Sequence, residues 1–290
     1  MRDDAPGTAA PVLPLTADRV AVILSTYNWP HALELSLAGW AAQTRRDFQM
    51  VVADDGSRDD TRALIDRFRA DTGIDTLHVW HEDRGFRKSE ILNRAIVATA
   101  REYVVFSDGD TIPRADLIEV HARHARPGRF LAGGYVKLPE ATSAAITLDD
   151  VRSGRAFDLR WLRAHGYRPG RYALRFTRVA PWAALLDAAT SQKVRWVGNN
   201  ASTWRRHLID ANGFDMEMGY GGQDAALGDR LENLGLEPKR IRYRTLALHL
   251  HHERPWRDPA GMRKNVEIRQ RIRASGEVRA TRGIAELEPA

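Results

Sequence analysis

Short apolar runs that end in polar residues recur along the first part of the chain. Their β-branched and aromatic content and their length are typical of buried strands, which we predict at residues 20–24, 50–53, 76–80 and 103–106. A polar loop and then apolar residues at helical spacing follow, as at Leu64, Ile65 and Phe68. Strands that alternate with helices predict an α/β protein with a mostly parallel central sheet and helices on both faces.

The pattern changes toward both ends of the chain. Residues 1–17 are rich in Ala and Pro and predict a disordered leader. Residues 18–260 contain the strands and helices, with a further apolar run at 131–138 and an alternating segment typical of an edge strand at 240–244, and predict one α/β domain. Residues 261–290 are rich in Arg and Glu with few apolar residues, so we expect a basic C-terminal helix or tail.

Composition narrows the classes of protein that the chain can be. The 290 residues are 43% hydrophobic and 28% charged, which is typical of a globular protein, and no run approaches the roughly 20 apolar residues of a membrane helix. There is no cysteine, which excludes disulfides, thiolate metal sites and cysteine nucleophiles and fits a cytoplasmic protein. The net charge of +6 favours anionic partners such as nucleotide sugars, anionic lipid surfaces or nucleic acid.

The strand at 103–106 runs into two carboxylates, Asp108 and Asp110, separated by Gly109. Ligands of open α/β sheets bind at this end of the strands. Two carboxylates so close repel each other unless a cation or a donor lies between them, and the glycine lets the backbone turn so that both can face one site. We predict that they help to hold a divalent metal on a nucleotide diphosphate; the alternative is an ordinary turn before a helix near Asp116.

Five segments resemble, in the same order along the chain, the motifs of family 2 glycosyltransferases with the GT-A fold. They are residues 25–28 (Ser-Thr-Tyr-Asn), 54–57 (Asp-Asp-Gly-Ser), 83–95, 108–110 (Asp-Gly-Asp) and 221–224 (Gly-Gly-Gln-Asp). Residues 83–95 look most like bacterial chondroitin-polymerase-type enzymes. Residues 221–224 resemble the GGED box of those enzymes and of β1,4-galactosyltransferases, although Gln223 stands where the box has glutamate. The resemblance covers residues 20–255.

The resemblance implies the GT-A fold and the transfer of a sugar from a UDP-sugar to a glycan or lipid-linked acceptor, in bacterial surface polysaccharide synthesis. In the nucleotide site that it implies, Asp54 would accept a hydrogen bond from the uracil imide. Arg84 and Lys88 would meet the diphosphate at a helix start, where backbone amides also favour anions, unless both are surface charges. The residues that would line the base pocket are Ser25, Thr26 and Tyr27.

A metal site is expected around Asp110. We expect this carboxylate to be a direct ligand and Asp108 to contact the ribose or a metal-bound water. Oxygen ligands suit Mg²⁺ or Mn²⁺, and an imidazole favours Mn²⁺. By resemblance His249 occupies the place of a family histidine, and His251 would share its face if the segment is extended, whereas His252 would point away. A purely structural role is the alternative for these histidines.

Asp224 is the expected general base. It follows a glycine-rich segment that leaves room for a sugar, and the resemblance places Gly222 and Gln223 at the acceptor. A single base on the acceptor side implies direct displacement, and therefore inversion at the anomeric carbon. The alternative is that this carboxylate only caps a helix that runs to about residue 234.

Two other functions remain open at this point. A nucleotidyltransferase acting on sugar phosphates would also use a strand-end acidic pair and a metal, but its first strand would lead into a basic glycine-rich loop. A non-catalytic basic anion-binding protein is suggested by the net charge and by an Arg-rich, aromatic stretch at 160–178. The other interpretations of this stretch are a surface helix, an acceptor-binding segment, or a peripheral contact with the anionic inner face of a membrane. The acidic loops would repel bare phosphates, so we do not expect nucleic acid as a partner.

Overall fold

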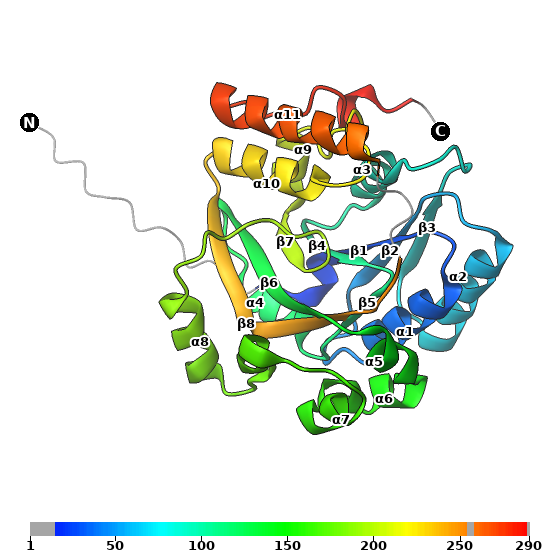
Figure 1. Cartoon of the computed structure of the whole chain (residues 1–290). Coiled ribbons are helices and arrows are strands. Elements are labelled where there is room, and N and C mark those ends of the chain that lie inside the picture. The colour runs from blue at the N-terminus through cyan, green and yellow to red at the C-terminus, as the bar shows by residue number, and fades with distance from the viewer. Residues whose placement is uncertain (1–14, 254–257, 289–290) are drawn as a thin grey trace, which may run out of the picture.

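One eight-stranded sheet forms the centre of the protein, and helices cover both of its faces (Figure 1). The computed structural model describes residues 15–253 and 258–288. The strand order is β3-β2-β1-β4-β7-β6-β8-β5. The strands are β1 (Val20–Thr26), β2 (Gln49–Asp54), β3 (Thr76–Trp80), β4 (Tyr103–Asp108), β5 (Thr111–Pro113), β6 (Arg129–Lys137), β7 (Ala201–Trp204) and β8 (Glu237–His249).

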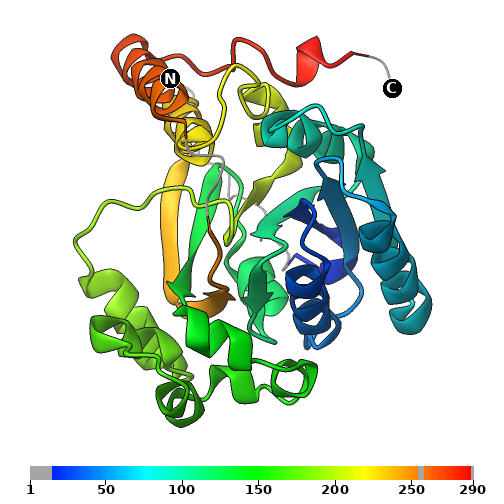
Figure 2. The ribbon, with the colours of Figure 1, turned by 45° about the vertical axis from the view of Figure 1, so that its right-hand side comes forward.

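Eleven α-helices lie within the described residues and are linked by loops and short 3₁₀ turns. Two of them, α10 and α11, lie side by side at one end of the molecule (Figure 2). The helices are α1 (Pro30–Ala41), α2 (Asp59–Thr72), α3 (Lys88–Ala98), α4 (Leu117–His124), α5 (Glu140–Ala145), α6 (Leu148–Arg152), α7 (Leu159–Ala164), α8 (Ala180–Ala189), α9 (Arg205–Asp210), α10 (Gln223–Asn233) and α11 (Pro259–Ser275).

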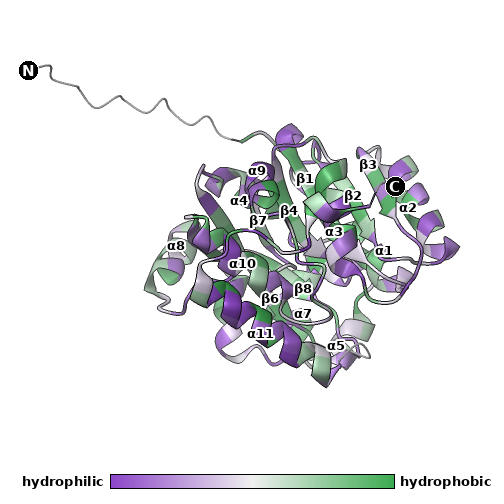
Figure 3. Ribbon diagram, turned by 90° about the horizontal axis from the view of Figure 1, so that it is seen from above, coloured by the Kyte–Doolittle hydropathy of each residue, from purple (hydrophilic) through white to green (hydrophobic). Residues whose placement is uncertain are grey.

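The half of the sheet formed by β3, β2, β1 and β4 is parallel, as predicted. Side chains of β1 alternate between two cores: Val22 and Leu24 pack with residues of α1 and α2, whereas Ala21 and Ile23 pack with residues of α3. Because both faces are covered, the strands read as continuous apolar runs, and Figure 3 shows β1, β2 and β4 as largely apolar. The carboxyl ends of β1 and β4 therefore lie side by side at one edge of the sheet.

The other half of the sheet is mixed. Strand β7 is antiparallel to β4 and to β6, β8 is parallel to β6, and β5 is antiparallel to β8. The segment at 240–244, expected to be an edge strand, is part of the longer β8, and this expectation is wrong because β5 takes the edge position beside it. A bulge at Gly133–Gly134 shifts the register of β6 and β8, and a side chain on Gly134 would lie 2.1 Å from the carbonyl oxygen of Arg242.

The two terminal segments contribute to the packed structure. Most of the expected leader, residues 1–14, lies outside the described residues, whereas Leu15 and Ala17 are buried. The basic segment at 261–290 forms most of α11, whose Ile268 and Ile272 pack against Met218 and α10. No helix in the described part of the chain is long and apolar enough to cross a membrane.

Candidate active site

A cleft of about 790 Å³ opens where β1 and β4 end and α10 begins. Asp108, Asp110, Asp224 and His249, which come from distant parts of the chain, all line it. Also in the lining are the predicted nucleotide and acceptor residues Ser25, Thr26, Tyr27, Lys88, Gly222 and Gln223. Most of the predicted site residues therefore meet in one place.

The position of Asp108 follows from strand register. Ser25 on β1 is its partner across the parallel ladder, and the Ser25 hydroxyl donates a hydrogen bond of 2.7 Å to its Oδ1. Lys88 Nζ, at the first turn of α3, lies 2.6 Å from the same oxygen. The amide of Gly109 donates to the carbonyl of Ser25 at 2.7 Å, and a Cβ there would lie 3.1 Å from that oxygen, so the turn after β4 has little room for a side chain.

Asp110 faces two histidines at the end of β8. Its Oδ2 lies 3.1 Å from Nε2 of His252 and 3.8 Å from Nε2 of His249. Ligand atoms of these three residues lie within 4.8 Å of one another. The Nδ1 atom of His249 lies 2.7 Å from the carbonyl of Leu250, which leaves Nε2 toward the carboxylate. One carboxylate and two imidazoles suit Mn²⁺ better than Mg²⁺.

The electrostatics of Asp110 agree with a cation site. Burial on its own would raise the pKa of this carboxyl. The hydrogen bond with His252 and the nearby charges of His249, His252 and Lys88 outweigh burial and leave the pKa below its usual range. The carboxylate is therefore charged and able to act as a ligand.

The structure corrects the expectation for His251. Strand β8 ends at His249, so the alternation of side chains does not continue through the next residues. His251 is exposed, is not part of the cleft lining, and its backbone amide donates to Ser143 Oγ at 2.8 Å. His252 takes the place beside Asp110, where its ring meets Trp29 edge-on with 5.8 Å between centroids.

Asp224 lies in the first turn of α10 and lines the cleft. The N-cap position belongs to Gly222, and no side chain caps the helix, so the capping alternative does not describe this carboxylate. Its Oδ1 is buried and has no hydrogen-bond partner among the described residues. A Cβ on Gly198 would lie 2.4 Å from that oxygen, so a side chain there would displace the carboxylate.

The pKa of Asp224 is raised. Burial is the largest cause, and the charge of Asp108 acts in the same direction, whereas Lys88 and the amide of Gly198 act against both. For Lys88, burial lowers the pKa, but the charges of Asp108, Asp224 and Asp110 prevail and raise it, so the amine stays protonated. A buried carboxylate with a raised pKa, aimed into a cleft, is suited to accept a proton.

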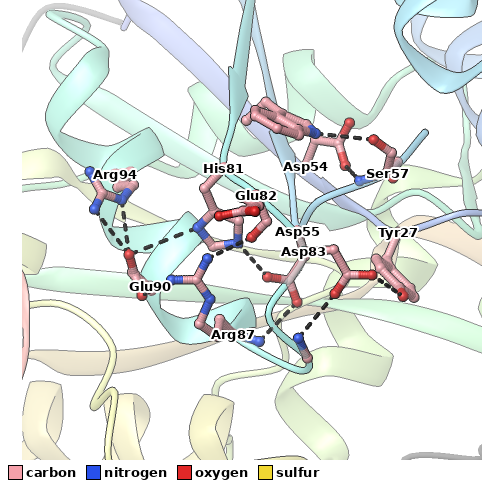
Figure 4. Close-up of polar contacts among 12 residues, drawn as sticks. Tyr27, Asp54, Asp55, Ser57, His81, Glu82, Asp83, Arg87, Glu90 and Arg94 are labelled. Carbon is pink, nitrogen blue, oxygen red and sulfur yellow. Dashed lines mark hydrogen bonds and ion pairs between the residues drawn. The ribbon is translucent and has the colours of Figure 1, made fainter. Parts of the chain in front are cut away.

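The acidic pair at the end of β2, Asp54 and Asp55, is arranged differently from the prediction. Asp54 is fully buried, and its oxygens bind the amide of Ser57 at 2.8 Å and His78 Nε2 at 2.9 Å, so it does not line the cleft. Asp55 lines the cleft instead. Figure 4 shows its oxygens between His81 Nε2 at 2.7 Å and the amide of Arg87 at 3.1 Å. Burial raises the pKa of Asp55, although His81 and Arg87 act against it. Because Asp55 lines the cleft and Asp54 does not, the second aspartate of the motif is the one that a ligand can reach.

The two residues predicted to meet the diphosphate, Lys88 and Arg84, lie in different places. Lys88 lines the cleft, but Arg84 is exposed, pairs with Glu82 at 2.8 Å, and lines a smaller cavity of about 290 Å³. Tyr27 keeps its predicted place and donates from its hydroxyl to Asp83 Oδ2 at 2.9 Å. For Arg84 the surface-charge alternative describes the structure.

Sequence reasoning missed the contribution of α11 to the cleft. The buried amide of Asn265 donates to the carbonyls of Gly219 at 3.2 Å, Tyr220 at 3.1 Å and Gly221 at 2.6 Å, so it holds the loop that precedes α10. Met262 on the same helix lines the cleft. The sequence predicted only a basic helix or tail in this region, and no sequence signal marks Asn265.

Comparison with known proteins adds three findings. A family model described as Glycosyl transferase family 2 matches residues 21–155. Validoxylamine A glucosyltransferase of Streptomyces hygroscopicus subsp. jinggangensis is 27% identical over 251 residues, which are 81% of this chain and 56% of that protein. Chondroitin synthase of Escherichia coli is 29% identical over 100 residues, which are 34% of this chain and 14% of that protein.

Among solved structures, a mannosyltransferase from Pyrobaculum calidifontis in complex with GDP-Man and Mn²⁺ has a similar fold. The TM-score is 0.54 at 23% identity, and the match covers 82% of this chain and 58% of that one. The chain thus spans little more than half the length of the glucosyltransferase and of the mannosyltransferase.

Proposed function

The chain belongs to the family 2 glycosyltransferases and has their GT-A fold, and from this premise we propose which reaction it performs. It transfers a sugar from a UDP-sugar to a hydroxyl group of a glycan or lipid-linked saccharide, with a divalent metal and with inversion at the anomeric carbon. The observation that carries this proposal is the meeting of Asp108, Asp110, Asp224 and His249 in one cleft.

The donor side of the cleft would hold the nucleotide diphosphate. Asp110, His249 and His252 would hold Mn²⁺, or Mg²⁺, which when bound compensates the charge of the leaving diphosphate. Lys88 adds a permanent positive charge at the amino end of α3, where backbone amides also favour anions. Asp108 would contact the ribose, and Asp55 would take the role expected of Asp54 and accept from the uracil imide.

The acceptor side would carry out the proton transfer. Asp224 takes the proton of the acceptor hydroxyl as its oxygen forms a bond to the anomeric carbon and the bond to the diphosphate breaks. Gly222 and Gln223 lie beside this carboxylate and would contact the acceptor sugar. One base on one side of the sugar gives a single displacement, which inverts the configuration.

The proposal includes a cellular role and a location for the enzyme. We propose a role in bacterial surface polysaccharide synthesis, in the cytoplasm, and a lipid-linked acceptor would bring the enzyme into peripheral contact with an anionic membrane surface. Residues 18–260 would form the catalytic domain, and α11 would complete it because it holds the loop before α10.

A screen of nucleotide sugars tests the proposal. Thermal unfolding is measured with UDP-glucose, UDP-galactose, UDP-N-acetylgalactosamine and UDP-glucuronate, each with Mn²⁺ or with chelator, and UDP release is followed by chromatography. We expect metal-dependent stabilisation by at least one of them, of about 2.7 kcal/mol at a ligand concentration 100 times its Kd. The variant Asp110→Asn should lose it.

Two outcomes would contradict the proposal. One is the absence of stabilisation and of UDP release with every UDP-sugar in the presence of Mn²⁺. The other is the formation of a nucleotide sugar from a nucleoside triphosphate and a sugar phosphate, which would identify a nucleotidyltransferase.

A further inference from the structure

Exposed apolar side chains gather around α8. Ten large hydrophobic residues are exposed in the described part of the chain, and half of them lie between residues 172 and 185. We call this group the α8 face; its exposed fractions run from 38% to 58%, and its members are Tyr172, Leu174, Val179, Trp182 and Leu185. Contiguous exposed apolar surface on a globular protein marks a surface that binds something.

Helix α8 has an inner side that is fixed and an outer side that the rest of the described chain leaves uncovered. On the inner side, the buried Asp187 accepts from the amide of Tyr243 at 3.2 Å and pairs with Arg244 at 3.1 Å. Val179, Trp182 and Leu185 are spaced three residues apart and so follow one another along the outer side. Figures 1 and 3 show α8 at the edge of the molecule, and all three side chains are more than half exposed.

The sequence that includes the α8 face is strongly basic. Residues 159–195 contain eight Lys or Arg and a single acidic residue, Asp187, which is buried and paired. Arg175 and Arg171 lie over the Tyr172 ring, 4.4 and 5.2 Å from its centroid. The exposed arginines of this stretch are Arg160, Arg163, Arg168, Arg171, Arg178 and Arg195.

We propose that the α8 face docks on an anionic phospholipid bilayer. Trp182 and the neighbouring apolar side chains would enter the interface between headgroups and acyl chains, and the arginines would pair with the anionic headgroups. An acidic protein would match the arginines but not five exposed apolar side chains around one short helix, and a second copy of this face would bring like charges together.

The position of α8 in the chain relates this surface to the reaction. Gly198, which lies against Asp224, follows the end of α8 at Ala189 by nine residues. Nine residues span at most about 32 Å, so the end of α8 and Gly198, against which the general base lies, are no farther apart than that. Resting on the proposed function, a bilayer on the α8 face would hold a lipid-linked acceptor with its sugar near the acceptor side of the cleft.

Vesicle flotation of the full chain tests the docking. We expect binding to vesicles of phosphatidylglycerol and phosphatidylcholine, weaker binding at high salt, and none to phosphatidylcholine alone. Trp182→Ala combined with Leu185→Ala should weaken binding at least tenfold. Arg171→Gln combined with Arg178→Gln should weaken binding about 30-fold, and the binding of this variant should depend less on salt than that of the wild type. The matched control is Val97→Ala combined with Val266→Ala, two apolar residues of similar exposure elsewhere, and should bind as wild type does.

The readouts separate this proposal from the proposed function. Each variant is first checked for an unchanged melting temperature, and its UDP release without vesicles should equal that of wild type. Equal binding of the wild type to anionic and neutral vesicles would overturn the docking, whatever the donor assays show. So would a dimer in sedimentation experiments that disappears with Trp182→Ala and Leu185→Ala while no vesicle binding is seen.

Discussion

The two sides of the cleft are built in different ways. On the donor side, Ser25 and Asp108 are register partners on adjacent parallel strands, so the sheet ladder itself places them. On the acceptor side, Asp224 depends on the close approach of Gly198 and on a loop held by Asn265. Ladder hydrogen bonds tolerate the loss of one side chain, whereas a loop held by few contacts does not. Substitutions that leave the fold intact should therefore disturb the acceptor side more selectively.

The largest effect is expected for Asp224→Asn. The change removes the proton acceptor without changing the shape of the side chain, and general base catalysis contributes about 10²- to 10⁴-fold to a rate. UDP release in the presence of acceptor should fall by that factor, while UDP binding measured by calorimetry stays as in wild type. The control on the same helix is Glu232→Gln, which pairs with Lys193 away from the cleft. Wild-type turnover in Asp224→Asn would show that another group takes the proton.

The adjacent histidines offer the next comparison. His252→Ala removes a nitrogen 3.1 Å from Asp110, whereas His251→Ala removes an exposed ring outside the cleft. Loss of even an outer-sphere partner weakens metal binding by about 10- to 100-fold, so His252→Ala should weaken Mn²⁺ affinity at least that much. Manganese titrations of UDP binding measure it. Equal weakening by His251→Ala would place the ion elsewhere.

These residues also show how far sequence reasoning reaches. The strands of the parallel half were predicted within a few residues, because buried strands covered on both faces have a distinctive apolar pattern. Asp108 and Asp110 followed from that pattern, since ligands of open α/β sheets bind at the carboxyl ends of the strands. Ser25, Thr26 and Tyr27 at the end of β1 were implied by the family resemblance instead.

The remaining differences have a local cause. The choice of His251 assumed a strand that continued past His249, and the end of a strand is set by its partner, here β5, which pairs with β8 only up to that residue. The family resemblance assigned the uracil contact to Asp54, but Asp54 still belongs to β2 and is fully buried. Such details depend on neighbours that are remote in sequence.

The pH dependence of the rate should distinguish the role of Lys88 from that of Arg84. The base acts when deprotonated, so the rate should fall as the pH drops through the pKa of Asp224, which burial raises and Lys88 opposes. Lys88→Met should raise that pKa further and move the acid limb of the rate profile to higher pH. Arg84→Met, which removes an exposed charge paired with Glu82, should leave the limb in place. An unchanged limb in Lys88→Met would mean that this profile reports another group.

The smallest effect tests the acceptor side most selectively. Asn265→Ala removes three hydrogen bonds to the loop at 219–221, which should lower the free energy of unfolding by about 1–3 kcal/mol. The acceptor KM should rise several-fold, because the loop leads directly into Gly222 and Asp224, while UDP binding stays unchanged.

Asn233→Ala is the matched control for that change. Its amide also bridges α10 and α11, but it donates to the carbonyls of Ile272 and Glu277 at 3.1 and 2.8 Å and touches no part of the loop. If both variants lose stability and only Asn265→Ala raises the acceptor KM, the C-terminal helix acts on the reaction through the loop. If both variants raise the acceptor KM equally, α11 contributes only to stability. In that case Asn265 has no specific role on the acceptor side of the cleft.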